Sequence, residues 1–296
     1  MKKRNVAKLL SCLLALTGIF LLSACGEAGD EGRKQEGSSD GKPIVAVTIV
    51  PEKTFAEAVC GDLAEVITLV PPGSSPENYE PTPQIMEKFS KAEVYFALGV
   101  PTEEANILPN AGKVKVVHLE EQVAAAYADR TFGPGERDPH TWLSPKRAKV
   151  MVAGIAEEMS RLDPANQEVY EANAQAYMDQ LDQLDQEIAS LLAGVKNRQF
   201  VVYHPAFGYL ADDYGLQMVA LEEEGKESTI QHLTEMVDLA KKENIKVIFY
   251  QEEIDSSQSA AFAQEIGGTT VKLEPLAADY IDNLKKMAET MAEVME

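Results

Sequence analysis

Four side chains with metal-binding chemistry stand at separate places along this sequence. His204 directly follows a run of apolar residues, and His140 lies in a polar loop just before a helical pattern. Glu77 and Glu274 each come after further apolar runs. Two imidazoles and two carboxylates form a set of nitrogen and oxygen donors that suits Zn²⁺ or Mn²⁺. A histidine that follows a strand is also commonly a hydrogen-bonded structural residue, so the residue types alone leave both interpretations open.

Eight short runs of apolar and β-branched residues predict the strands that would position these side chains. Helical patterns separate the runs, and an alternation of strands and helices predicts parallel sheets. Hydrophobicity is nearly continuous in runs such as 247–250, as expected for strands that are covered on both faces. Ligands of open parallel sheets bind beyond the carboxyl ends of the strands, where Glu77, His204 and Glu274 fall, while His140 lies in a loop before a helix. The predicted strands are 43–50, 65–70, 94–98 and 113–117 in the first half, and 199–203, 217–221, 245–250 and 269–273 in the second.

A long helix is predicted between the two sets of strands. Apolar residues between positions 177 and 191 recur at spacings of four and three, which places them on one helix face. Asp163-Pro164 predicts where the helix begins and Gly194 where it ends. At 1.5 Å per residue, about 30 residues would extend over roughly 45 Å. We therefore predict an α/β fold with two lobes, each a parallel four-stranded sheet flanked by helices, at residues 43–162 and 195–296, joined by one long rigid helix at 163–194.

The amino terminus resembles the signal sequence of a bacterial lipoprotein. A cationic start precedes an apolar run of about 14 residues, short of the roughly 20 that span a bilayer as a helix. The run ends in Leu22-Ser23-Ala24-Cys25, which is similar to a lipobox. This predicts removal of residues 1–24 and a lipid on the thiol of Cys25, so the protein would be anchored to the cell membrane on its extracytoplasmic side. Residues 25–42 are rich in Gly, Ser and charge, which predicts a flexible tether.

Charge and cysteine content exclude some classes of partner and fold. The formal net charge is −21, and removal of residues 1–24 deletes four basic and no acidic residues, which brings it to −25. Such a charge repels nucleic acid and attracts cations. Cys60 would be the one thiol left without a lipid, so an internal disulfide is not expected. We expect a monomer.

Four motifs in chain order resemble one protein family. They are Pro-Gly-Ser-Ser-Pro-Glu-Asn-Tyr-Glu-Pro-Thr-Pro (72–83), Asp-Pro-His-Thr-Trp-Leu-Ser-Pro (138–145), Tyr-His-Pro-Ala-Phe-Gly-Tyr-Leu-Ala-Asp-Asp-Tyr-Gly-Leu (203–216) and Leu-Glu-Pro-Leu (273–276). They look like the successive motifs of the zinc- and manganese-binding solute-binding lipoproteins of ABC transporters. The resemblance implies two α/β lobes bridged by a long helix, with the metal ion buried between the lobes.

The resemblance also implies that the metal ligands are Glu77, His140, His204 and Glu274. The first ligand of the family is ordinarily His and the fourth Asp, so this sequence departs at both. His204 is typical of zinc-binding members, whereas the carboxylate of Glu77 favours harder ions. Zinc-binding members also often carry a His-rich loop, and residues 120–137 contain no His. We expect Zn²⁺, with Mn²⁺ or Fe²⁺ as the alternatives.

Three further residues at strand ends could contact the ligands rather than the ion. They are Glu252, Glu253 and His118, each with a surface or structural role as the alternative. Four ligands leave no open coordination position, which suits binding better than catalysis. We therefore expect a receptor that captures the metal and delivers it to an ABC permease. The rivals are a secreted zinc hydrolase, although the sequence has no His-Glu-x-x-His or Gly-x-Ser-x-Gly motif, a surface adhesin, on which no sequence feature bears, and a carrier of a different ligand.

Overall fold

A computed structural model describes residues 41–222, 228–254 and 257–295 of the chain. The predicted signal peptide 1–24, the predicted lipidation site Cys25 and all but the last two residues of the predicted tether 25–42 lie outside the described residues. Within those ranges, no helix combines the length and the apolar character that crossing a membrane requires.

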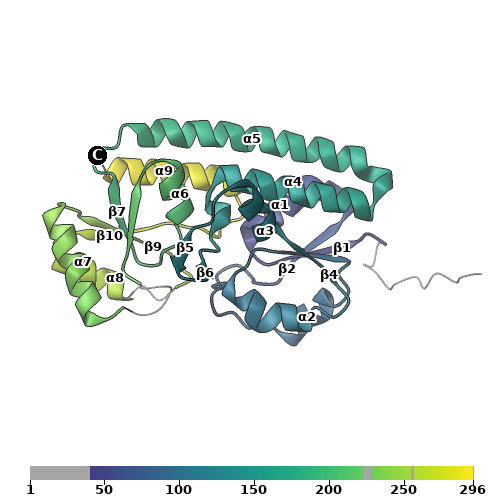
Figure 1. Cartoon of the computed structure of the whole chain (residues 1–296), viewed down its shortest axis with the longest axis horizontal. Helices are drawn as coiled ribbons and strands as arrows, with labels where there is room; N and C mark the ends of the chain where they lie inside the picture. The colour runs from purple at the N-terminus through teal and green to yellow at the C-terminus, as the bar shows by residue number, and fades with distance from the viewer. Residues whose placement is uncertain (1–40, 223–227, 255–256, 296) are drawn as a thin grey trace, which may run out of the picture. The chain divides into compact units, whose positions relative to one another are not determined.

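The first lobe is built on a parallel four-stranded sheet in the order β2-β1-β3-β4 (Figure 1). Val45 and Val47 of β1 face one core, and Ile44 and Ala46 face another. Both faces are therefore buried, which explains the nearly continuous hydrophobicity of these strands. The strands are β1 (Ile44–Val47), β2 (Glu65–Thr68), β3 (Val94–Ala97) and β4 (Lys115–His118), and the main helices are α1 (Val50–Cys60), α2 (Pro83–Phe89), α3 (Leu119–Ala126) and α4 (Pro145–Leu162).

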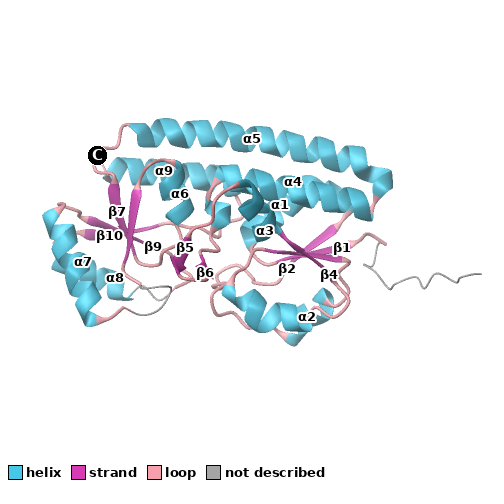
Figure 2. Cartoon of the chain, in the orientation of Figure 1, coloured by secondary structure: helices cyan, strands magenta, loops and turns pink. Residues whose placement is uncertain are grey.

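The second lobe repeats this plan with a parallel sheet in the order β10-β9-β7-β8. Phe200 and Phe249 face the core shared with α9, while Val201 and Ile248 face a core that includes residues of α7 and α8. Figure 2 shows the two sheets as separate sets of strands, each with helices beside it. The elements are β7 (Gln199–Val202), β8 (Gln217–Ala220), β9 (Val247–Tyr250), β10 (Thr269–Lys272), α6 (Gly208–Asp213), α7 (Ile230–Lys242), α8 (Ser257–Glu265) and α9 (Tyr280–Val294).

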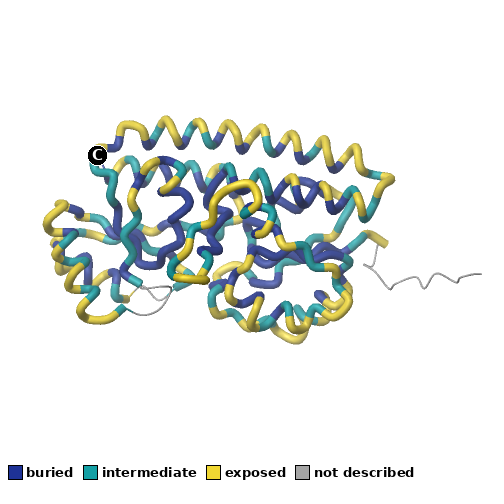
Figure 3. The backbone as a smooth tube through the Cα atoms, in the orientation of Figure 1, coloured by how far each residue is buried: buried dark blue, intermediate teal, exposed yellow. Residues whose placement is uncertain are grey.

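The long helix α5 (Gln167–Ala193) packs on α4 of the first lobe and on α9 of the second. Its buried side chains are spaced by three and four residues, and its outer side is exposed along its length (Figure 3). A 3-10 turn, Pro164–Asn166, precedes it, so the α-helix begins three residues later than Asp163-Pro164 predicts. The helix is capped at Gly194, as predicted. The predicted fold class, two parallel four-stranded lobes linked by one long helix, is confirmed.

Two features of the first lobe differ from the sequence prediction. The predicted strand 43–50 is too long, because Val50 and Pro51 begin α1. A short antiparallel pair, β5 (Thr131–Gly133) and β6 (Glu136–Arg137), was not predicted, and it leads into the loop that carries His140.

Candidate metal centre

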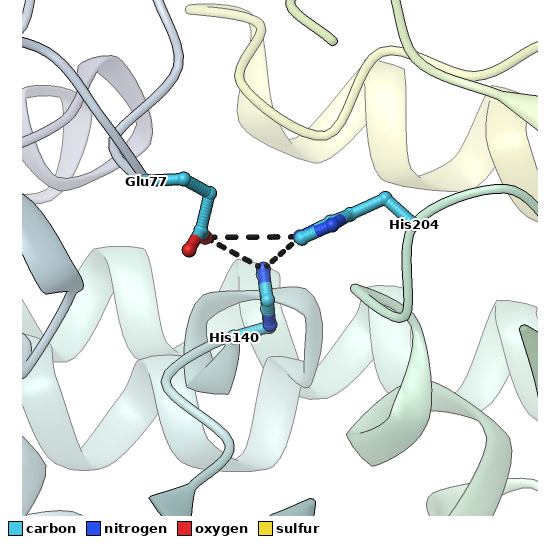
Figure 4. A group of neighbouring side chains, drawn as sticks. All are labelled: Glu77, His140 and His204. Atoms are coloured by element: carbon cyan, nitrogen blue, oxygen red, sulfur yellow. Dashed lines mark hydrogen bonds and ion pairs between the residues drawn. The ribbon is translucent and has the colours of Figure 1, made fainter. Parts of the chain in front are cut away.

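Three side chains from distant parts of the chain converge on one point (Figure 4). His140 Nε2 and His204 Nε2 are 3.2 Å apart, and Glu77 Oε1 lies 3.6 Å from the first and 3.7 Å from the second. Ligand atoms about 2.0–2.2 Å from a tetrahedral Zn²⁺ would be about 3.3–3.6 Å from each other. The three atoms therefore already have the spacing of three corners of a zinc site.

The loop after β2 carries Glu77. Pro72 and Gly73 make a tight turn, in which Gly73 has a φ of +79° and Ser74 N donates to Pro71 O. Ser75 Oγ accepts a hydrogen bond from Glu77 N at 3.2 Å. The turn and the hydroxyl together direct the chain away from the sheet edge, so that the carboxylate of Glu77 faces the two histidines.

The two histidines come from opposite lobes. His140 precedes a 3-10 turn, Thr141–Leu143, and its ring lies 5.2 Å from that of Trp142. His204 lies two residues beyond β7, at the carboxyl end of the second sheet, as predicted. Both are almost fully buried, at 3% and 4% exposure, so their ring nitrogens need partners inside the protein.

A carboxylate orients each imidazole. His140 Nδ1 bonds Asp138 Oδ1 at 2.8 Å, and His204 Nδ1 bonds Glu222 Oε2 at 2.6 Å. An ionised carboxylate can only accept, so each Nδ1 carries the proton and each Nε2 presents a lone pair to the centre. This is the tautomer that binds a metal ion through Nε2.

A positive charge is needed where these atoms meet. With both Nδ1 atoms protonated, two lone pairs and a carboxylate oxygen point at one another over less than 4 Å. Glu77 Oε1 is buried and has no hydrogen-bond partner among the described residues. Either a proton or a metal ion would relieve this repulsion.

The pKa values of the site follow from this arrangement. Burial by itself lowers the pKa of His140, but the hydrogen bond to Asp138 and the carboxylate of Glu77 outweigh it and raise the pKa to about 9. Burial by itself raises the pKa of Glu77, but the two imidazoles that face it outweigh burial and hold the pKa below its ordinary value. The metal-free site therefore keeps an ionised Glu77 and a proton on His140 at neutral pH.

Several contacts tie the loop of His140 to the second lobe. Tyr209 OH donates to Asp138 O at 3.0 Å and accepts from Arg130 N at 3.1 Å. Arg147 Nη1 bonds Asp213 Oδ1 at 3.0 Å. A Cβ at Gly208 would lie 2.4 Å from Arg130 Nε and 2.9 Å from Asp138 Oδ2, so a side chain there would displace Arg130 from its place beside Asp138. We call these contacts of Tyr209 and Arg147 the braced interface; they hold the loop of His140 against the lobe that carries His204.

A known protein family matches most of the chain. The sequence model of ZnuA, described as zinc-uptake complex component A, periplasmic, matches residues 45–294. The chain belongs to this family. The resemblance inferred from the four motifs is confirmed, and ZnuA-family proteins are solute-binding receptors of metal transport and not enzymes.

Two relatives and one solved structure match most of this chain. The chain is 32% identical to the zinc-binding lipoprotein AdcA of Streptococcus pneumoniae over 98% of its own length and 59% of AdcA, so it spans about three fifths of that protein. It is 28% identical to the high-affinity zinc uptake system protein ZnuA of Bacillus subtilis, over 93% of this chain and 96% of ZnuA. A crystal structure of ZnuA superposes with a TM-score of 0.80 at 34% identity, covering 86% of this chain and 100% of that one.

Of the four ligands that the ZnuA-family motifs imply, the structure brings together Glu77, His140 and His204. Glu274 does not join them: its Oε1 bonds Lys272 Nζ at 3.0 Å. The backbone beside it is close to the site, because Pro275 O accepts from Trp142 Nε1 at 2.9 Å and Trp142 packs on His140. Its role as a fourth ligand stays a prediction.

None of the three residues predicted to contact the ligands has a hydrogen bond to them among the described residues, and two of the three bind other partners. Glu252 Oε2 bonds Lys272 Nζ at 2.9 Å, and His118 Nδ1 bonds Glu120 Oε1 at 2.7 Å. Glu253 has a buried Oε2 without a hydrogen-bond partner among the described residues. The carboxylates that do contact the histidines are Asp138 and Glu222, which the sequence analysis did not assign. Asp138 stands in the Asp-Pro-His motif and could have been proposed from its spacing, and Glu222 could have been proposed because it directly follows the predicted strand 217–221.

Proposed function

We propose that this protein is the extracytoplasmic receptor of a zinc importer, which captures one Zn²⁺ between its lobes and delivers it to an ABC permease. The observation that carries the proposal is the convergence of Glu77, His140 and His204, with both imidazoles oriented for metal binding. The names of the relatives AdcA and ZnuA, a zinc-binding lipoprotein and a zinc uptake protein, agree with it.

Glu274 is proposed as the fourth ligand. It would complete two nitrogens and two oxygens around the ion, and the two carboxylates would neutralise the charge of Zn²⁺. To bind, its side chain must leave Lys272 while its backbone stays near Trp142. A closed set of four ligands binds a cargo ion without leaving a position for a reactive water.

Zinc is favoured over manganese and iron by the donor set. Two imidazoles suit Zn²⁺, whereas Mn²⁺ prefers sites made largely of oxygen ligands. Glu77 in place of the family's usual histidine shifts the site part of the way towards harder ions. Mn²⁺ and Fe²⁺ are therefore the competing cargoes, and we expect both to bind more weakly.

The setting of the receptor follows from the amino terminus and the charge. A lipid on Cys25 would hold the protein at the outer side of the cell membrane, beside its permease, and the sequence 25–42 would let the body move above the surface. The strongly negative charge raises the local concentration of divalent cations. We expect the receptor to act as a monomer.

Metal-binding titrations of the purified, metal-free protein test this function. We expect one Zn²⁺ per chain, displacement of Mn²⁺ and Fe²⁺ by Zn²⁺, and a higher melting temperature with Zn²⁺ than with the other two ions. A chain that binds none of the three ions at a one-to-one ratio would refute the proposal. A chain that prefers Mn²⁺ would keep the receptor and change its cargo.

A further inference from the structure

One short segment after β3 holds the loop of Glu77 on both sides of that residue. Thr102 N donates to Pro76 O at 3.1 Å, one residue before Glu77. Two residues after it, Tyr79 O accepts from both Thr102 Oγ1 and Asn106 Nδ2, the latter at 3.1 Å. We call Thr102 and Asn106 the clamp. Because both flanks of Glu77 are bound to the clamp, the position of its carboxylate depends on these hydrogen bonds.

The part of this loop that follows Glu77 borders a groove on the protein surface. An open surface groove of about 350 Å³ lies between the end of the loop, the start of α2 and Asn106. It is lined by Glu80, Pro81, Pro83, Met86, Asn106 and Asn110. Asn106 lines this groove, whereas Thr102 is buried at 1% exposure, so the clamp has one side chain in the interior and one at the groove.

The clamp itself is anchored deep in the first lobe. Glu103, between the two clamp residues, is fully buried and accepts from Leu98 N at 3.0 Å and from Gly99 N at 2.7 Å. Thr48, just after β1, donates its hydroxyl to the same carboxylate. The segment Glu103–Ile107 is a π-helical turn, a rare conformation that is frequent at functional sites. The carboxyl ends of β1 and β3 thus fix the clamp.

From these contacts we propose that Thr102 and Asn106 are positioning residues, which set the metal affinity by holding Glu77 at ligand distance from His140 and His204. The inference rests on the proposed zinc function. The loop of His140 is held by contacts between the lobes, whereas the loop of Glu77 is held by its own turn and by the clamp, which binds the backbone on both sides of Glu77. Movement of the clamp would withdraw one ligand and leave the two histidines in place, which offers a route for release of the ion.

Thr102→Val and Asn106→Ala test the clamp in the full-length protein, with Zn²⁺ as the probe. Each substitution removes one hydrogen bond to Tyr79 O, and we expect about 3- to 10-fold weaker Zn²⁺ binding for each. Asn110→Ala is the matched control, because Asn110 lines the same groove and its Nδ2 bonds Asn106 O at 2.9 Å, whereas no hydrogen bond from it to the loop is found among the described residues. We expect Asn110→Ala to leave the affinity unchanged.

A double-mutant cycle distinguishes the loss of Glu77 positioning from a general disturbance of the fold. In a Glu77→Ala background, Asn106→Ala should cost no further Zn²⁺ affinity, because the residue that it positions is gone. In a His140→Ala background, Asn106→Ala should keep its full effect. Equal losses of affinity in the parent and in the Glu77→Ala background would overturn the inference. Failure of the parent protein to bind Zn²⁺ would instead refute the proposed function, so the two failures are distinguishable.

Discussion

Each histidine of the site is a base whose orientation is set by a carboxylate behind it. Asp138 and Glu222 fix the protons on Nδ1 of His140 and His204, which leaves Nε2 of each ring to bind a proton or a metal ion. In the metal-free protein that cation is a proton, because the pKa of His140 is raised to about 9. Zn²⁺ must displace this proton, so stability and affinity should respond to pH in opposite directions.

We predict that the metal-free protein loses stability between pH 6.5 and 9. A raised histidine pKa gives stability that is fully present below the ordinary value of 6.5 and is lost as pH rises through about 9. The free energy of unfolding should therefore fall by a few kcal/mol over this interval, while Zn²⁺ affinity rises. Urea unfolding of the parent and of His140→Gln at both pH values measures this change in the free energy of unfolding. An equal loss of stability in His140→Gln would assign the effect to other groups.

Under the proposal that Glu274 is the fourth ligand, Lys272 would compete with the metal ion for its carboxylate. Its ammonium lies between Glu252 and Glu274, and both ion pairs are partly exposed. We predict that Lys272→Gln raises Zn²⁺ affinity about two- to fivefold, as the loss of one exposed ion pair allows. Competition with a chelator of known affinity would measure the change.

The control for this prediction is Lys285→Gln. It removes the same charge from the pair that Lys285 makes with Glu187, which links α9 to α5. A similar gain of affinity in both variants would show that general charge, and not release of Glu274, is responsible.

At the scale of elements, the strands and helices that carry the ligands were largely predictable. All eight long strands were located, because a sheet buried on both faces needs continuous apolar runs. The pair β5–β6 was missed, because its strands have three and two residues and carry no periodicity. Val50 was assigned to a strand since a valine before proline can end a strand or begin a helix.

The site was predictable from its motifs and less so from spacing. His140 and His204 stand out because the chain has only four histidines. Glu222, like His204, directly follows a predicted strand, but its support of His204 depends on the pairing of β7 with β8, and the order of strands in the sheet was not predicted. The partner of Glu274 depends on a side-chain conformation, which no sequence pattern specifies.

The hydroxyl of Tyr209 makes two of the hydrogen bonds that join the loop of His140 to the second lobe. Tyr209→Phe would leave Asp138 O and Arg130 N without this partner in a buried position. We predict a loss of about 1–3 kcal/mol in the free energy of unfolding. Zn²⁺ affinity should fall as well, because Asp138 orients His140.

Tyr127→Phe is the comparison for Tyr209→Phe. Its ring also contacts the guanidinium of Arg147, at 5.2 Å, but it is 37% exposed. We expect the Tyr127→Phe protein to lose little stability when both variants are unfolded in urea. A Tyr209→Phe protein as stable as the parent would show that the hydrogen bonds of the Tyr209 hydroxyl do not stabilise the fold.

At the scale of the whole molecule, the two lobes share one core. A continuous hydrophobic cluster includes Phe96 of the first sheet, Leu181 of α5 and Phe200 of the second sheet. The long helix packs along both lobes and carries no glycine or proline between its ends. Wide opening of the lobes would therefore expose apolar surface that is buried here.

We predict that Zn²⁺ changes side chains and loops of the site more than the overall dimensions. Small-angle X-ray scattering of the metal-free and Zn²⁺-loaded protein should give the same radius of gyration within error. A clear compaction on adding one equivalent of Zn²⁺ would contradict this prediction and would favour a hinge between the lobes.

The central claim is that Glu77, His140 and His204 bind the same zinc ion. Anomalous diffraction at the zinc edge, from crystals grown with one equivalent of Zn²⁺, tests it most directly. We predict one strong peak between the lobes, about 2.0–2.2 Å from Glu77 Oε1, His140 Nε2 and His204 Nε2. A zinc peak at any other place, with these three side chains turned away from one another, would contradict the account.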